Sequence, residues 1–226
     1  MRAGGCSNGG WGRAVTEVRV ILIRHGETQW NREGRVQGYH ADSPLTEAGR
    51  GQARALAERL ARERVDALYA SDTGRTRLTA SPIGAATGLR VIHDAGLRER
   101  NYGAFEGRTF AEVERDFPAE YERFRTRDPD YVPPGGESAT QFRDRVMAAL
   151  ERIAAEAAGK RVAVVTHGGV LGIAYRNAMD IPLDARRGYS LANASLNHFR
   201  YAAGRWLLEA WGDVAHLPAE SLRIPG

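Results

Sequence analysis

The chain has 226 residues, 42% of them hydrophobic and 27% charged, which is the composition of a globular domain and not of a disordered chain. No run of about 18 apolar residues is present to cross a membrane, and the net charge of +4 comes from arginines that alternate with Glu and Asp, so we expect neither a membrane nor a nucleic acid as partner. The single cysteine, Cys6, excludes an internal disulfide and fits a cytoplasmic setting.

Residues 1–17 contain arginines and several glycines but no apolar stretch, so we expect a flexible tail and not a secretory signal. In residues 18–226, strand-like and helix-like stretches alternate along the chain. This alternation predicts a single α/β domain, a three-layer sandwich with a mostly parallel central sheet and helices on both faces.

The first predicted strand is the apolar run at residues 18–23, which stops abruptly on Arg24, His25 and Gly26. Open α/β sheets bind ligands at the carboxyl ends of their strands, and a glycine there allows a sharp turn. An arginine beside a histidine suits an anionic group that must be held and attacked. We therefore interpret this junction as part of a ligand site.

A helix, a strand, a helix and a strand are predicted next, over residues 46–64, 67–70, 75–87 and 89–93. Thr46 is the expected N-cap of the first helix. The short strand ends on Ser71 and Asp72, with Arg75 one helical turn further on. Pro82 should kink the second helix or end it early, because proline lacks the N–H that a helix interior needs.

Residues 97–137 interrupt the alternation with charged helical fragments, scattered aromatic residues and a loop rich in proline and glycine. A connection of this length within an α/β domain is typically functional. We predict that it forms a lid over the carboxyl ends of the strands.

The last part of the chain returns to regular elements. An amphipathic helix is predicted over residues 138–158, and an apolar strand over residues 161–166 ends on His167, Gly168 and Gly169. A helix follows, and two closing strands are expected near residues 196–201 and 206–211.

Three predicted strands thus end on polar side chains that carry chemistry. If the sheet is parallel, these ends lie along one edge and their side chains converge. Two histidines and two arginines in one crevice repel one another unless an anion lies between them. A phosphoryl group is the expected occupant, because its oxygens match the forked donors of arginine.

In order and spacing, the motifs resemble those of the histidine phosphatase superfamily, also called the phosphoglycerate mutase-like family, from residue 18 to about residue 201. The motifs are short and spread along the chain: Arg24-His25-Gly26-Glu27-Thr28, Trp30-Asn31, Gln37-Gly38, Leu45-Thr46 with Gly49, Gln52 and Ala53, Ser71-Asp72 with Arg75, Thr79 and Ala80, Leu97-Arg98-Glu99, Tyr102-Gly103, Phe105-Glu106-Gly107, Gly136-Glu137-Ser138, Phe142, Arg145, Thr166-His167-Gly168-Gly169 and Asn193. So many matches in order are far more specific than a single motif.

The resemblance implies a reaction through a phosphohistidine. His25 would be the nucleophile, which requires a neutral imidazole with one nitrogen free. Arg24, Arg75 and His167 would hold the non-bridging oxygens and neutralise charge in the transition state. Glu99 would protonate the leaving oxygen and then activate water, which requires a pKa above the usual ~4.3.

Further residues are expected to bind the substrate: Asn31, Gln37, Gly38, Arg100, Tyr102 and Gly168. The first and last of these would add hydrogen bonds to phosphate, whereas Arg100 and Tyr102 are candidates for contact with a second anionic group. No metal or other cofactor is expected, because Arg24 and Arg75 would repel a divalent cation and no short-spaced histidine pair or carboxylate cluster accompanies them.

Enzymes of this family hand the phosphoryl group either to water or back to a sugar-acid hydroxyl. The segment Glu99-Arg100-Asn101-Tyr102-Gly103 favours a mutase. A short lid without the lysine and paired arginines of the mutases, and His167-Gly168-Gly169 in place of His-Gly-Asn, favour a phosphatase.

We therefore predict a phosphatase that needs no cofactor and acts on a small phosphorylated metabolite, a phosphomonoester. A 2,3-bisphosphoglycerate-dependent phosphoglycerate mutase is the first alternative, and a non-catalytic protein that binds a phosphorylated ligand is the second. The natural substrate and the oligomeric state, including a homodimer, stay open.

Overall fold

The structure is a computed structural model that describes residues 17–218. The predicted tail at residues 1–17 lies, except for Glu17, outside the described residues. Within residues 17–218 no helix is long and apolar enough to span a bilayer. The elements begin and end close to the predicted positions, and one short helix, α1 (Gln29–Glu33), was not predicted.

Six strands form one sheet in the order β3-β2-β4-β1-β5-β6. The strands are β1 (Val18–Arg24), β2 (Ala67–Ala70), β3 (Val91–His93), β4 (Arg161–Thr166), β5 (Leu196–Ala202) and β6 (Arg205–Asp213). Strands β3, β2, β4 and β1 are parallel to one another, whereas β5 runs antiparallel to both of its neighbours. The prediction of a mostly parallel sheet is confirmed.

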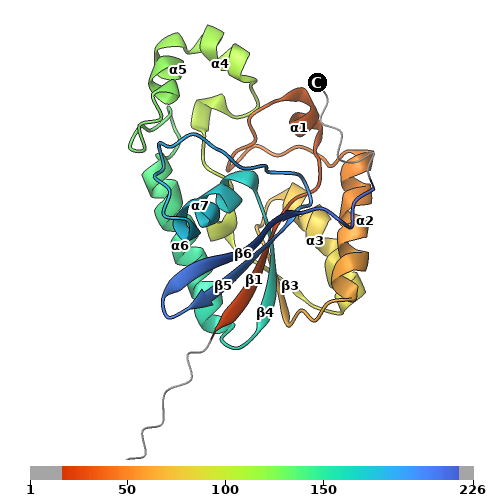
Figure 1. Cartoon of the computed structure of the whole chain (residues 1–226). Helices are drawn as coiled ribbons and strands as arrows, with labels where there is room; N and C mark the ends of the chain where they lie inside the picture. The colour runs from red at the N-terminus through yellow and green to blue at the C-terminus, as the bar shows by residue number, and fades with distance from the viewer. Residues whose placement is uncertain (1–16, 219–226) are drawn as a thin grey trace, which may run out of the picture.

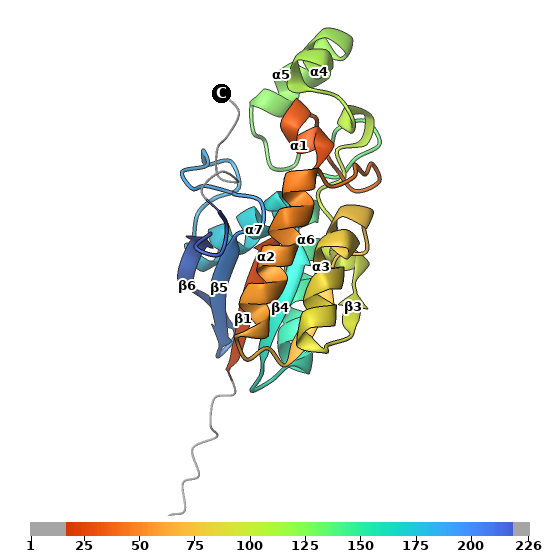
Figure 2. The ribbon, with the colours of Figure 1, turned by 90° about the vertical axis from the view of Figure 1, so that its right-hand side faces the viewer.

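Helices cover both faces of the sheet (Figures 1 and 2). Helices α2 (Glu47–Ala61) and α3 (Gly74–Thr87) pack on one face, and α6 (Ala139–Glu156) and α7 (Gly168–Ala178) pack on the other. The central strands are apolar on both sides because alternate side chains enter opposite cores. The three-layer α/β sandwich is therefore confirmed.

Strand β1 illustrates how the sequence produces these layers. Val20 and Leu22 belong to the core under α6 and α7, whereas Ile21 and Ile23 belong to the core under α2 and α3. All four side chains are almost completely buried. The buried part of this strand, residues 20–23, leads directly to Arg24 and His25 and fixes their place in the fold.

Residues 97–137 rise above the carboxyl ends of the strands, as Figure 1 shows. They contain the last residue of η1 (Ala95–Leu97), then η2 (Gly103–Phe105), α4 (Phe110–Asp116) and α5 (Pro118–Arg125). Phe117 and Phe124 both pack against Phe105, with ring centroids 6.0 and 5.8 Å from that of Phe105. The lid thus has a small aromatic core of its own.

The helix predicted over residues 75–87 is confirmed as α3, which continues through Pro82, so of the two effects expected of this proline the early end does not occur. Proline removes one backbone hydrogen bond, and the helix is kept by its packing instead. Ala80 and Ile83 are buried in the core that α3 shares with α2.

Candidate active site

The carboxyl ends of β1, β2 and β4 meet at the edge of the sheet under the lid. His25 follows β1, Ser71 follows β2 and His167 follows β4, and the register pairs Arg24 with Thr166. The ring centroids of His25 and His167 lie 5.5 Å apart in an edge-to-face arrangement. Two histidines that are far apart in sequence are therefore neighbours.

His25 is 3% exposed, and its Nδ1 lies 2.8 Å from the carbonyl oxygen of Gly26. A carbonyl oxygen only accepts, so Nδ1 carries the proton and donates it, which leaves Nε2 unprotonated. Burial, and then the charges of Arg75 and Arg24, hold the pKa of His25 well below its usual 6.5. Near neutral pH the ring is uncharged and Nε2 has a free electron pair.

The ring of His167 is in the opposite tautomeric form to that of His25. Arg75 donates its Nε–H to Nδ1 of His167 at 3.2 Å, and Nε2 of the ring lies 2.9 Å from Oγ of Ser71. Arginine cannot accept a hydrogen bond, so Nδ1 is the acceptor and Nε2 carries the proton. Burial and the charge of Arg75 hold the pKa of His167 well below 6.5.

Arg75 is 1% exposed, and the loop before α2 holds its guanidinium. It donates to the carbonyl oxygens of Gly38 and Ala41, at 3.0 and 3.2 Å, and pairs with the carboxylate of Asp42 at 2.9 Å. With Nε on His167, one of the five N–H groups has no acceptor among residues 17–218. Because Arg75 lines the cavity described below, this N–H is available to a ligand.

Arg24 also has spare donor capacity. One guanidinium nitrogen donates to the carbonyl oxygen of Leu191, but the buried Nε has no partner in the described part of the chain. Burial lowers the pKa of Arg24 to about 10, so it stays charged at neutral pH. A buried donor without an acceptor is costly, and an anion in the adjacent cavity would satisfy it.

Glu99 is 9% exposed and is held by two backbone N–H groups. Its Oε1 accepts from Arg100 and its Oε2 from Gly169, both at 2.8 Å. Burial raises the pKa of Glu99 and outweighs these hydrogen bonds and the charges of Arg75 and Arg24, which lower it. A carboxyl group in such a setting is suited to give up a proton and take it back.

Gly169 makes room for this carboxylate. A Cβ at residue 169 would lie 2.0 Å from Oε1 of Glu99, so no side chain fits there. The His167-Gly168-Gly169 sequence thus brings Glu99 against the N-terminus of α7. Gly168 lies beside the guanidinium, since its Cβ would be 3.4 Å from Nε of Arg24.

Asn31 and Gln37 both line the cavity, as expected. Oδ1 of Asn31 accepts from the backbone of Thr28 at 3.2 Å and from Nδ2 of Asn193 at 3.1 Å, so its own Nδ2 is left to donate. Gln37 has a buried Oε1 with no partner within residues 17–218. Both amides are therefore positioned for a polar ligand.

Gly38 is different, because it lines neither cavity. Its carbonyl oxygen holds Arg75, and a Cβ there would lie 1.9 Å from Oε1 of Glu106. It acts behind the site and does not meet the substrate directly.

Arg100 and Tyr102 lie at the base of the lid. Arg100 donates to the carbonyl oxygens of Glu137 and Tyr131, at 3.0 and 3.3 Å, and lies 5.3 Å from the ring centroid of Tyr102. Its guanidinium is thus used to join lid segments. Burial raises the pKa of Tyr102 to about 12, so the phenol stays protonated and can donate.

Two residues of the motifs have roles that residue type alone does not indicate. The carboxylate of Glu106 accepts backbone N–H groups of Tyr102 and of the loop that holds Arg75, namely Tyr39, His40 and Ala41. Arg145 pairs with Glu137 and donates to the carbonyl oxygens of Gly96, Arg98 and Glu99. Glu106 therefore positions the loop behind Arg75, and Arg145 positions the backbone of Glu99.

Two cavities adjoin these residues. A narrow one of about 200 Å³, here called the phosphate pocket, is lined by Arg24, His25, Asn31, Gln37, Arg75, Glu99, Tyr102 and Gly168. A wide one of about 1350 Å³, here called the lid cavity, shares Arg24, Glu99 and Tyr102 and extends beneath α4 and α5. Residues 17–218 contain no group of three or more His, Cys, Asp or Glu side chains that could hold a metal ion.

Comparisons with known proteins agree with this geometry. Residues 20–214 match the family described as histidine phosphatase superfamily (branch 1). The chain is 42% identical to a metal-independent phosphoserine phosphatase of Arabidopsis thaliana over 90% of this chain and 84% of that protein. It is 41% identical to phosphoglycerate mutase-like protein 4 of the same plant, over 90% and 88%. The solved structure of Bacillus stearothermophilus YhfR superimposes with a TM-score of 0.82 at 33% identity, over 89% of this chain and 100% of that one.

Proposed function

This chain belongs to the histidine phosphatase superfamily, and on that premise we propose that it hydrolyses small phosphomonoesters through a phosphohistidine intermediate. The observation that carries the proposal is the protonation state of His25. Its Nδ1–H is bound to the Gly26 carbonyl, its pKa is depressed by burial, and its Nε2 is free. A buried neutral imidazole between two arginines is suited to attack an anionic phosphorus centre.

In the first step, Nε2 of His25 bonds to phosphorus while the bond from phosphorus to the ester oxygen breaks. Glu99 gives its proton to the departing oxygen, which leaves as an alcohol. In the second step, Glu99 takes a proton from water as the water oxygen bonds to phosphorus. The bond between phosphorus and Nε2 then breaks and inorganic phosphate is released.

The remaining residues of the phosphate pocket stabilise charge. Arg24 and Arg75 each have an N–H without an acceptor in the described structure. His167 lines neither cavity and directs its Nε2–H to Ser71, so it acts by holding Arg75 through Nδ1. Donors fixed before the reaction stabilise the equatorial oxygens in the transition state without reorganisation. The amide of Asn31 supplies a neutral donor at the same place.

A phosphoglycerate mutase-type activity is the second candidate, supported by the mutase-like relative and by Glu99-Arg100-Asn101-Tyr102-Gly103. We rank it below hydrolysis because Arg100 is bound to two lid carbonyls and because Gly169 replaces the asparagine of the mutase pattern. The lone cysteine, Cys6, supports the further proposal that the enzyme works in the cytoplasm.

Incubation with 3-phosphoglycerate, with and without 2,3-bisphosphoglycerate, tests the ranking. Free phosphate and 2-phosphoglycerate are followed together, and O-phosphoserine is the second substrate. We expect release of phosphate with no requirement for the bisphosphate. Isomerisation that is stimulated by bisphosphoglycerate and exceeds phosphate release would make the protein a mutase instead.

A further inference from the structure

The arginines of this protein differ in whether they have a carboxylate partner. Most arginines among residues 17–218 form an ion pair with Asp or Glu. Those without one within these residues gather mainly in the wall of the lid cavity: Arg24, Arg32, Arg100, Arg127, Arg176, Arg186 and Arg187. The positive charge that the described fold leaves uncompensated is thus concentrated beside the phosphate pocket.

Three of these arginines, Arg32, Arg186 and Arg187, are exposed, and their guanidinium groups have no hydrogen bond to a described residue. Only Arg186 and Arg187 are adjacent to each other in the chain. Arg100, Arg127 and Arg176 are different, because each donates to backbone carbonyl oxygens. Adjacent cations repel one another, and an anionic ligand between or beside them removes that repulsion.

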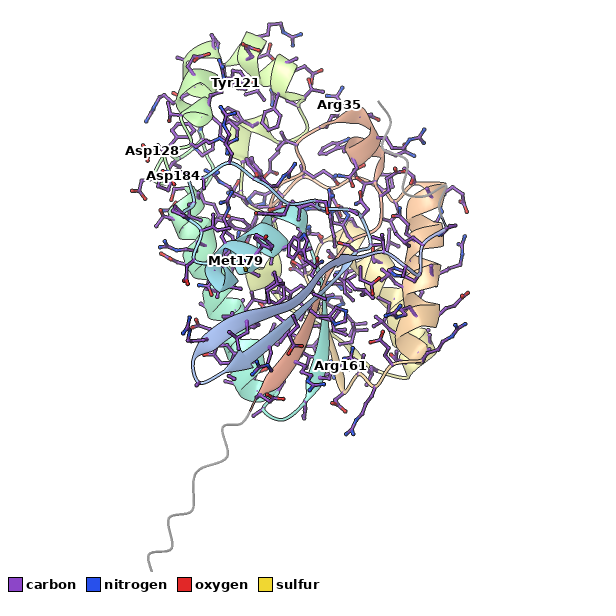
Figure 3. All side chains as sticks on the ribbon, viewed as in Figure 1. Arg35, Tyr121, Asp128, Arg161, Met179 and Asp184 are labelled. Carbon is purple, nitrogen blue, oxygen red and sulfur yellow. The ribbon has the colours of Figure 1, made fainter. Side chains whose placement is uncertain are left out.

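The loop that carries Arg186 and Arg187 is held on both sides of these residues by hydrogen bonds and aromatic contacts. Before them, the carbonyl oxygen of Ala185 accepts from Arg176 of α7 at 2.8 Å and from Arg127 of the lid at 3.3 Å. In Figure 3, the neighbours of this junction in sequence, Asp128 of the lid and Asp184 of the loop, are labelled on the same flank of the molecule, far from Arg161. The loop is therefore joined to both walls of the lid cavity.

After them, aromatic residues hold the loop. The ring centroid of Tyr189 lies 4.1 Å from that of Tyr175 and 5.3 Å from that of Trp211. Nε1 of Trp211 donates to the carbonyl oxygen of Ser190 at 2.9 Å. The next residue, Leu191, accepts from Arg24 in the phosphate pocket. A rigid segment thus links the two free arginines to the site of phosphoryl transfer.

The opposite wall of the lid cavity is aromatic, with Phe110, Tyr121 and Phe124 in its lining. The rings of Phe110 and Phe124 are stacked at 5.7 Å, and Phe110 is 44% exposed. Asp128 is an acid in the same lining, and no ion pair joins it to Arg186 or Arg187. A ligand complements this cavity if its organic part packs on the aromatic wall and its far end carries a negative charge toward Arg186 and Arg187.

We propose that the substrate carries, beyond the phosphate that is cleaved, a second anionic group, a carboxylate or a second phosphate, and that Arg186 and Arg187 bind it. This inference rests on the proposed phosphatase function. Arg100, which was expected to meet a second anion, donates two of its five N–H groups to lid carbonyl oxygens, whereas Arg186 and Arg187 donate to no described residue. We therefore assign the role to the loop before β5.

Two pairs of esters that differ in one anionic group test the proposal. The carboxylate pair is 3-phosphoglycerate and glycerol 3-phosphate, and the phosphate pair is fructose 1,6-bisphosphate and fructose 6-phosphate. We expect kcat/KM to favour the more anionic member of one pair by about tenfold or more, as for one charge-assisted hydrogen bond. The pair with the larger ratio identifies the anion, and higher ionic strength should reduce that ratio.

Variants then locate the group that discriminates. The double variant Arg186→Ala with Arg187→Ala should reduce the ratio to about one. The matched control, Arg62→Ala with Arg205→Ala, removes two exposed arginines that lie outside the cavity lining and should leave the ratio unchanged.

Equal kcat/KM within both pairs, or a preference that survives in the Arg186/Arg187 double variant, would overturn the inference while the phosphatase function stands. Failure to release phosphate from all four esters and from O-phosphoserine would overturn the proposed function itself, and the inference with it.

Discussion

The phosphate pocket and the lid cavity share several lining residues, among them Arg24, Glu99 and Tyr102, but are constructed in different ways. Side chains of the phosphate pocket are buried or half-buried, and several are held by hydrogen bonds from distant parts of the chain, as for Arg75 on Gly38, Ala41 and Asp42. The lid cavity is wider, and its arginines at Arg186 and Arg187 are exposed. Under our two proposals, the groups that transfer the phosphoryl group are fixed in place before the substrate binds. The arginines that select the substrate gain an anionic partner only when it binds.

Replacement of the proposed nucleophile should give the largest effect. In His25→Ala, kcat should fall by at least about 10⁴-fold, because no other free imidazole nitrogen faces the phosphate pocket. The acid-labile phosphoryl-enzyme should disappear in a rapid-quench experiment with labelled substrate. His93→Ala, at an exposed histidine of β3, is the control and should keep wild-type activity. Full activity in His25→Ala would remove the nucleophile from this residue.

Glu99→Gln should have the next largest effect and should depend on the leaving group. For an alkyl phosphate the rate should fall by about 10²–10⁴-fold, because the departing oxygen needs a proton. For p-nitrophenyl phosphate, whose leaving group needs none, formation of the phosphoryl-enzyme should be affected much less, and the intermediate should accumulate. An equal loss with both substrates would contradict the role of Glu99 as general acid.

Glu106 holds the loop that in turn holds Arg75. Replacing Glu106 therefore tests whether this loop positions the phosphate pocket. Glu106→Gln weakens the acceptor for four backbone N–H groups, so we expect kcat/KM to fall about tenfold as Arg75 loses its alignment. The matched control is Glu58→Gln, at an exposed glutamate of α2. A fall in the melting temperature with unchanged kcat and KM would mean that Glu106 stabilises the fold without positioning the pocket.

The pH dependence of single-turnover phosphorylation should report the depressed pKa of His25. With p-nitrophenyl phosphate, whose leaving group needs no proton from Glu99, the rate depends on a neutral His25 ring. It should show no decline as the pH falls through 6.5 and should decline only at more acidic pH, where His25 takes up a proton. A decline centred on pH 6.5 would mean that the environment of His25 does not shift its pKa.

The smallest predicted effect concerns stability. Below about pH 6.5 the unfolded chain binds protons at His25 and His167, whereas the folded chain does not, because both pKa values are depressed. The free energy of unfolding should therefore fall as the pH is lowered, by up to about 1.4 kcal/mol per pH unit for each histidine. Urea unfolding of the wild type and of His25→Ala between about pH 7 and pH 5 measures the slope, which should be smaller in the variant.

Much of the fold could be predicted, because the relevant signals are local. Strand β1 is a continuous apolar run that ends on a charged residue, and α2 begins at a threonine whose side chain accepts from the backbone of Gly49 at 2.9 Å. Helix α3 could not be predicted as reliably, since Pro82 signals an end that the packing of Ala80 and Ile83 overrides. The short helix α1 was missed because its five residues carry no periodic apolar pattern.

By itself the sequence determined the class of fold, the family and the identity of the residues at the strand ends, because periodicity and motif spacing are properties of neighbouring residues. Only the tertiary structure decided which nitrogen of His25 is free, and that Gly38 supports Arg75 from behind. It also decided that Arg100 donates to lid carbonyl oxygens whereas Arg186 and Arg187 donate to no described residue. The physical reason is that tautomers, hydrogen-bond partners and charge compensation depend on groups far away in the chain. Ser71, for example, meets His167 across 96 positions of sequence.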